Sequence, residues 1–249
     1  MIELKQLCAG YTSDEVLHGI TASLGHGMLV SIVGPNGCGK STLLKTVAGI
    51  LRVQNGEVLL DGISASAMRR DALAARIAYL AQGKQAPAMT VGEMVLHGRF
   101  PHLHFPRRYS ARDREIAGTA MEALGIMQYA DTPVAALSGG MRQSAYLAMA
   151  LTQEADYILL DEPTTYLDIA NQISLMRLLH KLSRDGHGIA AVMHDLPLSL
   201  AYSDEIWVMR DGILVMTASP QEIVSSGVLH EVFGVDVRAD SGQYSYHFV

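Results

Sequence analysis

A glycine-rich loop that follows a short apolar stretch constrains the fold of this chain more than any other feature. Residues 34–42 read Gly-Pro-Asn-Gly-Cys-Gly-Lys-Ser-Thr and match the pattern G-x-x-x-x-G-K-[ST] without departure. The preceding residues 28–33 are mostly apolar and predict a buried parallel strand, and a helix is expected at about 40–49. Backbone N–H groups in such a loop, together with the positive end of the helix dipole, surround phosphate oxygens. The pattern therefore predicts a strand–loop–helix unit that binds phosphate.

Lys40 and Ser41 carry the chemistry of this loop. We expect Lys40 to reach the β- and γ-phosphates of a nucleotide and Ser41 to ligate Mg²⁺ through its hydroxyl. A second motif supports this, because the apolar residues 157–160 end in Asp161 and Glu162. Although the pair alone could be an exposed acidic turn, beside a phosphate loop it predicts carboxylates at the carboxyl edge of a parallel sheet. By position, we expect Asp161 to hold Mg²⁺ and Glu162 to orient the attacking water.

A third motif, Leu-Ser-Gly-Gly-Met-Arg-Gln at 137–143, lies between the other two. Ser138 is a favourable N-cap, and Gly139 and Gly140 leave the backbone open to an anion. In isolation the three residues would predict only a capped helix. Their continuation through residue 143 and the acidic strand end downstream favour a role in anion binding.

The hydrophobic pattern alternates between strands and helices, with one helical interruption at about 83–155. Strands are predicted at 2–8, 16–24, 28–33, 56–60, 76–81, 157–160, 188–193, 205–209 and 213–217. Helices are predicted at 40–49, 91–97, 111–124, 138–151, 169–183 and 196–202, and residues 99–108, with two prolines, predict a loop. The expected fold is α/β, with a mostly parallel sheet, helices on both of its faces and an inserted helical part.

Composition narrows the function further. The net charge of −6 over 249 residues disfavours a broad basic surface for nucleic acid. The two cysteines, Cys8 and Cys38, suggest neither a disulfide framework nor a metal site, so we expect a reducing compartment. No signal-peptide pattern opens the chain, and no apolar run reaches the roughly 18 residues of a membrane span.

Taken together, the motifs resemble those of an ATP-binding cassette (ABC) ATPase over nearly the whole chain. The phosphate loop, Gln82 after a strand, the Leu-Ser-Gly-Gly motif, the acidic strand end, Asp168 and His194 occur in the family's order. The resemblance implies one phosphate-loop ATPase domain spanning 1–249. Its core and an N-terminal antiparallel β subdomain would occupy about 1–82 and 156–249, with a helical subdomain at about 83–155.

The resemblance also assigns roles to individual residues. It implies that ATP is bound by Tyr11, which stacks on adenine, by Val16, and by Gly34, Pro35, Asn36, Gly37, Cys38, Gly39, Lys40, Ser41 and Thr42. Catalysis is implied for Lys40, Gln82, Glu162 and His194, and Mg²⁺ binding for Ser41, Gln82 and Asp161. Because two such ATPases face each other head to tail, Ser138, Gly139, Gly140 and Met141 would act on the partner's ATP, and Asp168 would contact the partner.

One departure from the family pattern lies in the third motif. Family members often carry Gln or Glu where Met141 stands and a basic residue where Ser144 stands. The side chain of Met141 offers no polar group to a nucleotide, although its backbone N–H could still do so. The departure bears on ATP affinity or hydrolysis rate and leaves the predicted fold unchanged.

Within the family, the chain is most similar to the ATPases of importers for iron–siderophore, haem and cobalamin. The segments 162–172, 95–102 and 194–204 carry this resemblance. It implies a homodimer of ATPase subunits docked on membrane permease subunits at the cytoplasmic face, with a binding protein that selects the cargo. The alternatives are a soluble cassette ATPase, such as an iron–sulfur assembly accessory, and a cassette working on DNA or ribosomes. The latter would carry long coiled-coil insertions or tandem cassettes, and this chain has neither.

Overall fold

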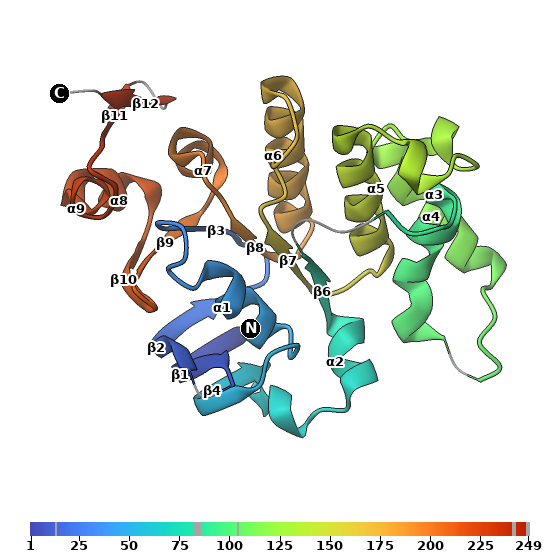
Figure 1. Cartoon of the computed structure of the whole chain (residues 1–249), viewed down its shortest axis with the longest axis horizontal. Coiled ribbons are helices and arrows are strands. Elements are labelled where there is room, and N and C mark those ends of the chain that lie inside the picture. The colour runs from blue at the N-terminus through green and yellow to red at the C-terminus, as the bar shows by residue number, and fades with distance from the viewer. Residues whose placement is uncertain (13, 82–85, 104, 241–242, 248–249) are drawn as a thin grey trace.

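The computed structural model describes residues 1–249 except 13, 82–85, 104, 241–242 and 248–249. Among the described residues, a six-stranded core sheet lies beside a four-stranded antiparallel sheet, and a layer of helices extends from one end of the core sheet (Figure 1). A two-stranded hairpin of β11 (Asp236–Asp240) and β12 (Gln243–His247) ends the chain. The α/β class predicted from the sequence is confirmed.

The core sheet has the strand order β10-β9-β3-β8-β7-β6. Its strands are β3 (Leu29–Val33), β6 (Ile77–Leu80), β7 (Tyr157–Asp161), β8 (Gly188–Val192), β9 (Glu205–Arg210) and β10 (Ile213–Ala218). All neighbouring pairs are parallel except β9 with β10. Every residue of β3, β7 and β8 is buried, because helices or the second sheet cover both faces, and this explains why these strands are almost continuously apolar.

Alternate residues of the core strands point into two separate apolar cores. On β7, Tyr157 and Leu159 pack with the antiparallel sheet, whereas Ile158 and Leu160 pack with helices on the other face. The antiparallel sheet has the order β2-β1-β4-β5, formed by β1 (Ile2–Tyr11), β2 (Asp14–Leu24), β4 (Val53–Leu60) and β5 (Ile63–Ser64). Because successive side chains of a strand point to opposite faces of the sheet, one strand contributes side chains to both cores.

Helices cover the core sheet on both faces. Helix α1 (Lys40–Val47) lies between the core sheet and the antiparallel sheet, whereas α6 (Ile169–Arg184) and α7 (Leu196–Tyr202) lie on the opposite face (Figure 1). The sequence patterns had not indicated β5, β11, β12 or three short helices, α2 (Arg70–Arg76), α8 (Pro220–Ser226) and α9 (Val228–Phe233).

The helical layer consists of α3 (Val91–Leu96), α4 (Ala111–Ala123) and α5 (Gly139–Thr152), and it lies at the β6 end of the core sheet (Figure 1). The predicted loop at 99–108 is partly wrong, because residues His97–His102 form a 3₁₀ helix. Arg99 explains the difference. Its buried guanidinium donates to Asp113 Oδ1 at 2.9 Å, Thr152 O at 3.0 Å and Glu154 Oε2 at 2.8 Å. One cation therefore ties this segment to α4 and to the end of α5.

Replacing Asp113 should expose the contribution of this buried ion pair. Hydrogen bonds from Ser110 and the neighbouring Arg99 guanidinium hold the pKa of Asp113 at about 2. A depressed carboxylate pKa stabilises the fold fully above about pH 4, and the stabilisation is lost as pH falls through about 2. Asp113→Asn should therefore lower stability near pH 7 by about 2 kcal/mol, because Arg99 loses a charged partner.

Thermal unfolding at several pH values measures this effect. The melting temperature of Asp113→Asn should lie roughly 5 °C below wild type at pH 7, and the gap should close as pH falls from about 4 toward 2. The exposed Asp131 supplies the control, since Asp131→Asn should unfold like wild type throughout. A gap that stays constant with pH would contradict the role given to the Asp113 carboxylate.

Candidate active site

Three site segments leave adjacent strands at one edge of the core sheet. They are the phosphate loop (residues 34–42) after β3, the segment with Glu162 after β7 and the segment with His194 after β8. Ile32 of β3, Val192 of β8 and Asp161 of β7 are paired in register, so the chain leaves all three strands at one level. The cleft at this edge has a volume of about 620 Å³. Its lining contains ten of the predicted site residues, namely Tyr11, Val16, Asn36, Gly37, Gly39, Lys40, Ser41, Thr42, Glu162 and His194.

The glycines of the phosphate loop are required by its backbone. Gly37 and Gly39 have φ values of 81° and 103°, which side chains rarely adopt. A Cβ on Gly34 would lie 2.3 Å from the carbonyl oxygen of Met209 on β9, so the loop passes too close to the sheet for any side chain there. The loop is thus held in a tight curve directly after β3.

Lys40 reaches back across the curve of the loop. Its buried Nζ donates to the carbonyl oxygens of Gly34 at 2.7 Å and Pro35 at 2.9 Å. Burial raises the pKa of the Cys38 thiol, whose Sγ lies 4.0 Å from this Nζ, so the thiol stays neutral beside the ammonium. The positive charge is therefore fixed on the cleft side of the loop, where an anion can meet it.

A turn between β9 and β10 supports the loop from behind. The backbone N–H of Gly212 donates to Cys38 O at 3.1 Å, and Gly212 O accepts from the N–H of His18 at 2.9 Å. The predicted strands at 205–209 and 213–217 leave residues 210–212 between them, but nothing in the sequence indicated this contact, because it joins residues far apart in the chain. Gly212 therefore connects the phosphate loop with the antiparallel sheet.

Ser41, which lines the cleft, contacts the buried Asp161 behind it. Ser41 Oγ donates to Asp161 Oδ1 at 2.8 Å, and the Tyr79 hydroxyl donates to Asp161 Oδ2 at 3.2 Å. Burial raises the pKa of Asp161, which makes its charged form more dependent on nearby cations. Oxygen donors of this kind suit Mg²⁺, which commonly takes one or two protein ligands together with phosphate oxygens. The described residues contain no cluster of three or more His, Cys, Asp or Glu side chains that could hold a metal ion.

Glu162 and His194 are brought into direct contact. His194 Nε2 lies 2.7 Å from Glu162 Oε1, and Thr165 Oγ1 donates to Glu162 Oε2 at 3.2 Å. Glu162 has a φ of 54°, a left-handed conformation that is unfavourable for a residue with a side chain. The backbone strain turns Glu162 out of the strand that buries Asp161, so two consecutive carboxylates face different partners.

Tyr11 also lines the cleft. In contrast to the ionisable Glu162 and His194 pair, it offers an exposed aromatic ring. Strand β1 runs three residues beyond its predicted end and thereby carries Tyr11 to α1. Although burial works in the other direction, hydrogen bonds with Thr42 and Lys45 hold the pKa of the Tyr11 hydroxyl below its usual value. Lys45 Nζ donates to this hydroxyl at 3.2 Å, a contact that the sequence patterns had not indicated.

The third sequence motif is absent from the lining of this cleft. Ser138 is the N-cap of α5, as predicted, and its Oγ accepts the N–H of Met141 at 3.3 Å. In this structure the helix cap uses this N–H, and the predicted role of Met141 toward a nucleotide stays a prediction. Asp168 caps α6 by accepting the N–H of Asn171 at 2.8 Å, and its predicted contact with a partner stays a prediction. Gln82 lies outside the described residues.

Comparisons with known proteins agree with this geometry. A family model described as ABC transporter matches residues 17–165. The ferric enterobactin transport ATP-binding protein FepC of Escherichia coli K12 is 41% identical over 93% of this chain and 86% of its own length. The iron(3+)-hydroxamate import ATP-binding protein FhuC of Bacillus subtilis 168 is 38% identical over 95% of this chain and 89% of its own.

Solved structures give the same result. A bacterial ABC transporter cassette solved as a dimer is 27% identical, with a TM-score of 0.79 over 88% of this chain and 99% of that one. An ABC transporter solved in an inward-facing conformation is 26% identical, with a TM-score of 0.83 over 100% of this chain and 96% of that one.

The support from Gly212 can be tested with two glycines of equal φ. Gly212 and Gly227 both have a φ of 78°, but a Cβ would lie 2.1 Å from Val16 O at Gly212 and meet nothing within 4 Å at Gly227. Replacing either by alanine should cost similar backbone strain, and Gly212→Ala should lose about 1–3 kcal/mol more because the backbone must shift. Urea denaturation of the two variants measures the difference. Equal losses of unfolding free energy in the two variants would show that the close approach at Gly212 does not contribute to stability.

Proposed function

The chain belongs to the ABC transporter family, and on that premise we propose that it is the ATP-hydrolysing subunit of an importer for iron–siderophore complexes. The contact between Glu162 and His194, in the same cleft as the phosphate loop, is the main observation that supports ATP hydrolysis. The relatives named for ferric enterobactin transport and iron(3+)-hydroxamate import, each matching more than 90% of the chain, support the cargo class. Haem and cobalamin remain related alternatives within the same class of importer.

The proposed reaction uses the cleft as follows. The adenine stacks on Tyr11 near Val16, and the N–H groups of the phosphate loop and the Lys40 ammonium hold the β- and γ-phosphates. Ser41 and Asp161 would hold Mg²⁺, which when bound neutralises phosphate charge. From the family pattern, we also assign Mg²⁺ binding to Gln82.

Glu162 and His194 act on the γ-phosphate in this proposal. Glu162 orients the water that attacks the γ-phosphorus, while the bond between that phosphorus and the β–γ bridging oxygen breaks and ADP leaves. His194 holds the attacked phosphate and the carboxylate in one geometry, for which their 2.7 Å contact provides the basis. Positioning and electrostatics together supply most of the rate enhancement in such transfers.

The segment at 138–141 is assigned to a second copy of the chain. It lies outside the cleft of its own chain, and its helix start offers backbone groups to an anion. In a head-to-tail homodimer the segment would complete the partner's ATP site, with Asp168 at the same interface. The dimeric cassette among the solved relatives supports this arrangement.

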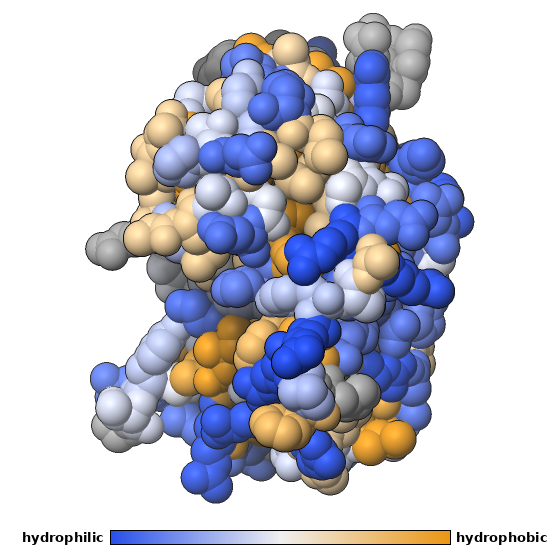
Figure 2. Space-filling view, turned by 90° about the vertical axis from the view of Figure 1, so that its right-hand side faces the viewer, coloured by the Kyte–Doolittle hydropathy of each residue, from blue (hydrophilic) through white to orange (hydrophobic). Residues whose placement is uncertain are grey.

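The proposed permease contact lies on the helical layer. No helix in the described ranges has the length and apolar character needed to cross a membrane. The face that contains the helical layer carries hydrophobic side chains among strongly hydrophilic ones (Figure 2). Phe100 and Phe105 are exposed, and Arg107 and Arg108 stand beside them in the sequence. Buried Arg99, by contrast, is an internal anchor and is excluded from this surface.

These partners place the chain at the cytoplasmic face of the membrane, with a binding protein delivering the cargo to the permease. A soluble cassette without a transport role, such as an iron–sulfur assembly accessory, is the alternative, and the names of the relatives do not favour it.

Glu162→Gln tests the catalytic assignment. The amide retains the size of the side chain and cannot act as a carboxylate toward water, so turnover should fall by on the order of 10²-fold or more while ATP still binds. Phosphate release and titration with a fluorescent ATP analogue measure the two quantities. The exposed Glu115 supplies a control, because Glu115→Gln should leave both unchanged. Turnover of Glu162→Gln near that of wild type would rule out the assignment.

Removing the exposed groups at 105–108 tests the permease contact. Phe105→Ser combined with Arg107→Ser and Arg108→Ser, with Arg99 retained, should reduce ferric-siderophore uptake several-fold by removing apolar and charged contacts. The ATPase rate of the purified chain should stay the same, because none of the three lines the cleft. A matched control removes Ile63, Arg69 and Arg70, one apolar and two basic exposed side chains elsewhere. Unimpaired uptake by the first variant would contradict the proposed contact.

A further inference from the structure

The turn that follows Glu162 (residues 162–167, the Glu162 turn) is attached to α5 at three points. Gly139, Gly140 and Gln143 are spaced so that they share one face of α5. A Cβ on Gly139 would lie 3.4 Å from Tyr166 Cβ, and one on Gly140 would lie 3.4 Å from Leu167 Cδ2. Helix α5, which begins within the Leu-Ser-Gly-Gly motif, therefore rests directly on this turn.

The third attachment is a hydrogen bond. The side-chain amide of Gln143 donates through Nε2 to the carbonyl oxygen of Pro163 at 3.0 Å. Pro163 is buried, so losing this donor would leave a buried carbonyl without the partner that α5 provides. Because Pro163 directly follows Glu162, the bond ends one residue from the proposed catalytic carboxylate.

The turn itself determines the position of Glu162. The N–H of Thr165 donates to Glu162 O at 3.3 Å, and its hydroxyl donates to the Glu162 carboxylate at 3.2 Å. Glu162 and Tyr166 have φ values of 54° and 69°, conformations that persist only where surrounding contacts enforce them. A displacement of the turn by α5 would therefore move the Glu162 carboxylate.

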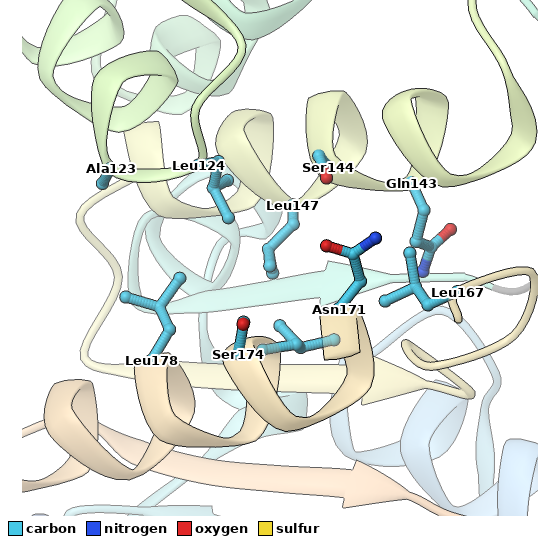
Figure 3. Close-up of a pocket in the computed structure, with 10 residues that line it drawn as sticks. Ala123, Leu124, Gln143, Ser144, Leu147, Leu167, Asn171, Ser174 and Leu178 are labelled. Atoms are coloured by element: carbon cyan, nitrogen blue, oxygen red, sulfur yellow. The ribbon is translucent and has the colours of Figure 1, made fainter. Parts of the chain in front are cut away.

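On its other side the turn is held by α6. Gln172 donates through Nε2 to Thr164 O at 3.4 Å and to Leu167 O at 3.1 Å. A pocket of about 130 Å³ lies between α5 and α6, and Figure 3 shows Gln143 and Leu167 at one end of it. Ser144, which is small where the family often has a basic residue, also lines this pocket. The Glu162 turn accepts hydrogen bonds from both helices and therefore connects α5 with α6.

From these contacts we infer that Gln143 is a positioning residue that couples the two ATP sites of the proposed dimer. The start of α5 would contact ATP bound by the partner, and the Gln143–Pro163 hydrogen bond would transmit the resulting position of α5 to Glu162 in the chain's own site. Occupancy of one site thereby sets the geometry of the catalytic carboxylate in the other. This inference rests on the proposed ATPase function and on the head-to-tail dimer.

Gln143→Met tests the inference, because methionine has a similar length and no donor. The purified full chain is assayed with ATP and Mg²⁺ over a range of ATP concentrations. Relative to wild type, kcat should fall by about 10-fold, the order of effect expected for one misplaced catalytic group. The KM for ATP should change less than about twofold, and a Hill coefficient above 1 in the wild type should fall to 1. Gln143→Lys, which retains a donor, should restore most of both kcat and cooperativity.

Gln153 provides a matched control at the other end of the same helix. Its amide donates to Ile77 O at 3.0 Å and to Ala74 O, remote from the Glu162 turn. Gln153→Met should lower the melting temperature about as much as Gln143→Met and leave kcat and the Hill coefficient unchanged. Normal kcat and cooperativity in Gln143→Met, equal kinetic losses in both variants, or a non-cooperative wild type would each overturn the inference. A wild-type chain without ATPase activity would instead refute the proposed function, and the inference with it.

Discussion

The register of three adjacent parallel strands is the constraint on which the candidate site depends. Ile32, Val192 and Asp161 lie at one level across β3, β8 and β7, so the segments that follow them emerge side by side. These segments carry the phosphate loop, Glu162 and His194, and in the chain Glu162 follows Thr42 by 120 residues and precedes His194 by 32. A shift of one residue in any strand would exchange the side chains that face the two cores and would displace the segment that follows the strand. The two apolar cores fix this register because each strand divides its side chains between them.

Two consecutive residues, Asp161 and Glu162, make different polar contacts in the site and so have different proposed roles. Asp161 ends the strand, is buried and joins Ser41, whereas Glu162 adopts a left-handed conformation and joins His194. A regular strand would also have pointed the two side chains to opposite faces, but it could not have supported the close turn that Thr165 completes. The same turn rests on α5, which links the cleft of one chain to a segment outside that cleft.

Sequence reasoning was most successful where local chemistry is strict. The phosphate loop, the capping by Ser138 and the strand that ends at Asp161 were predicted because each depends on a few residues in fixed order. It failed where a contact joins distant segments, as with Gly212 behind the phosphate loop, Lys45 at Tyr11 and Arg99 in the helical layer. Two prolines predicted a loop at 99–108, and nothing in the sequence indicated that Arg99 is buried, because a buried arginine gives the same sequence signal as an exposed one. Gln143 was visible within the motif at 137–143, but its acceptor belongs to a turn twenty residues away.

The central claim is that each ATP site is completed by a second copy of the chain. Analytical ultracentrifugation of the Glu162→Gln variant, with and without ATP, tests it most directly, because that variant should hold ATP unhydrolysed. The account predicts one copy without nucleotide and two copies with ATP, and a return to one copy when Ser138→Asp is added. Aspartate still caps α5 but repels the partner's phosphates, so ATP binding itself should persist. A chain that saturates with ATP and remains a single copy, or a dimer indifferent to Ser138→Asp, would contradict the account.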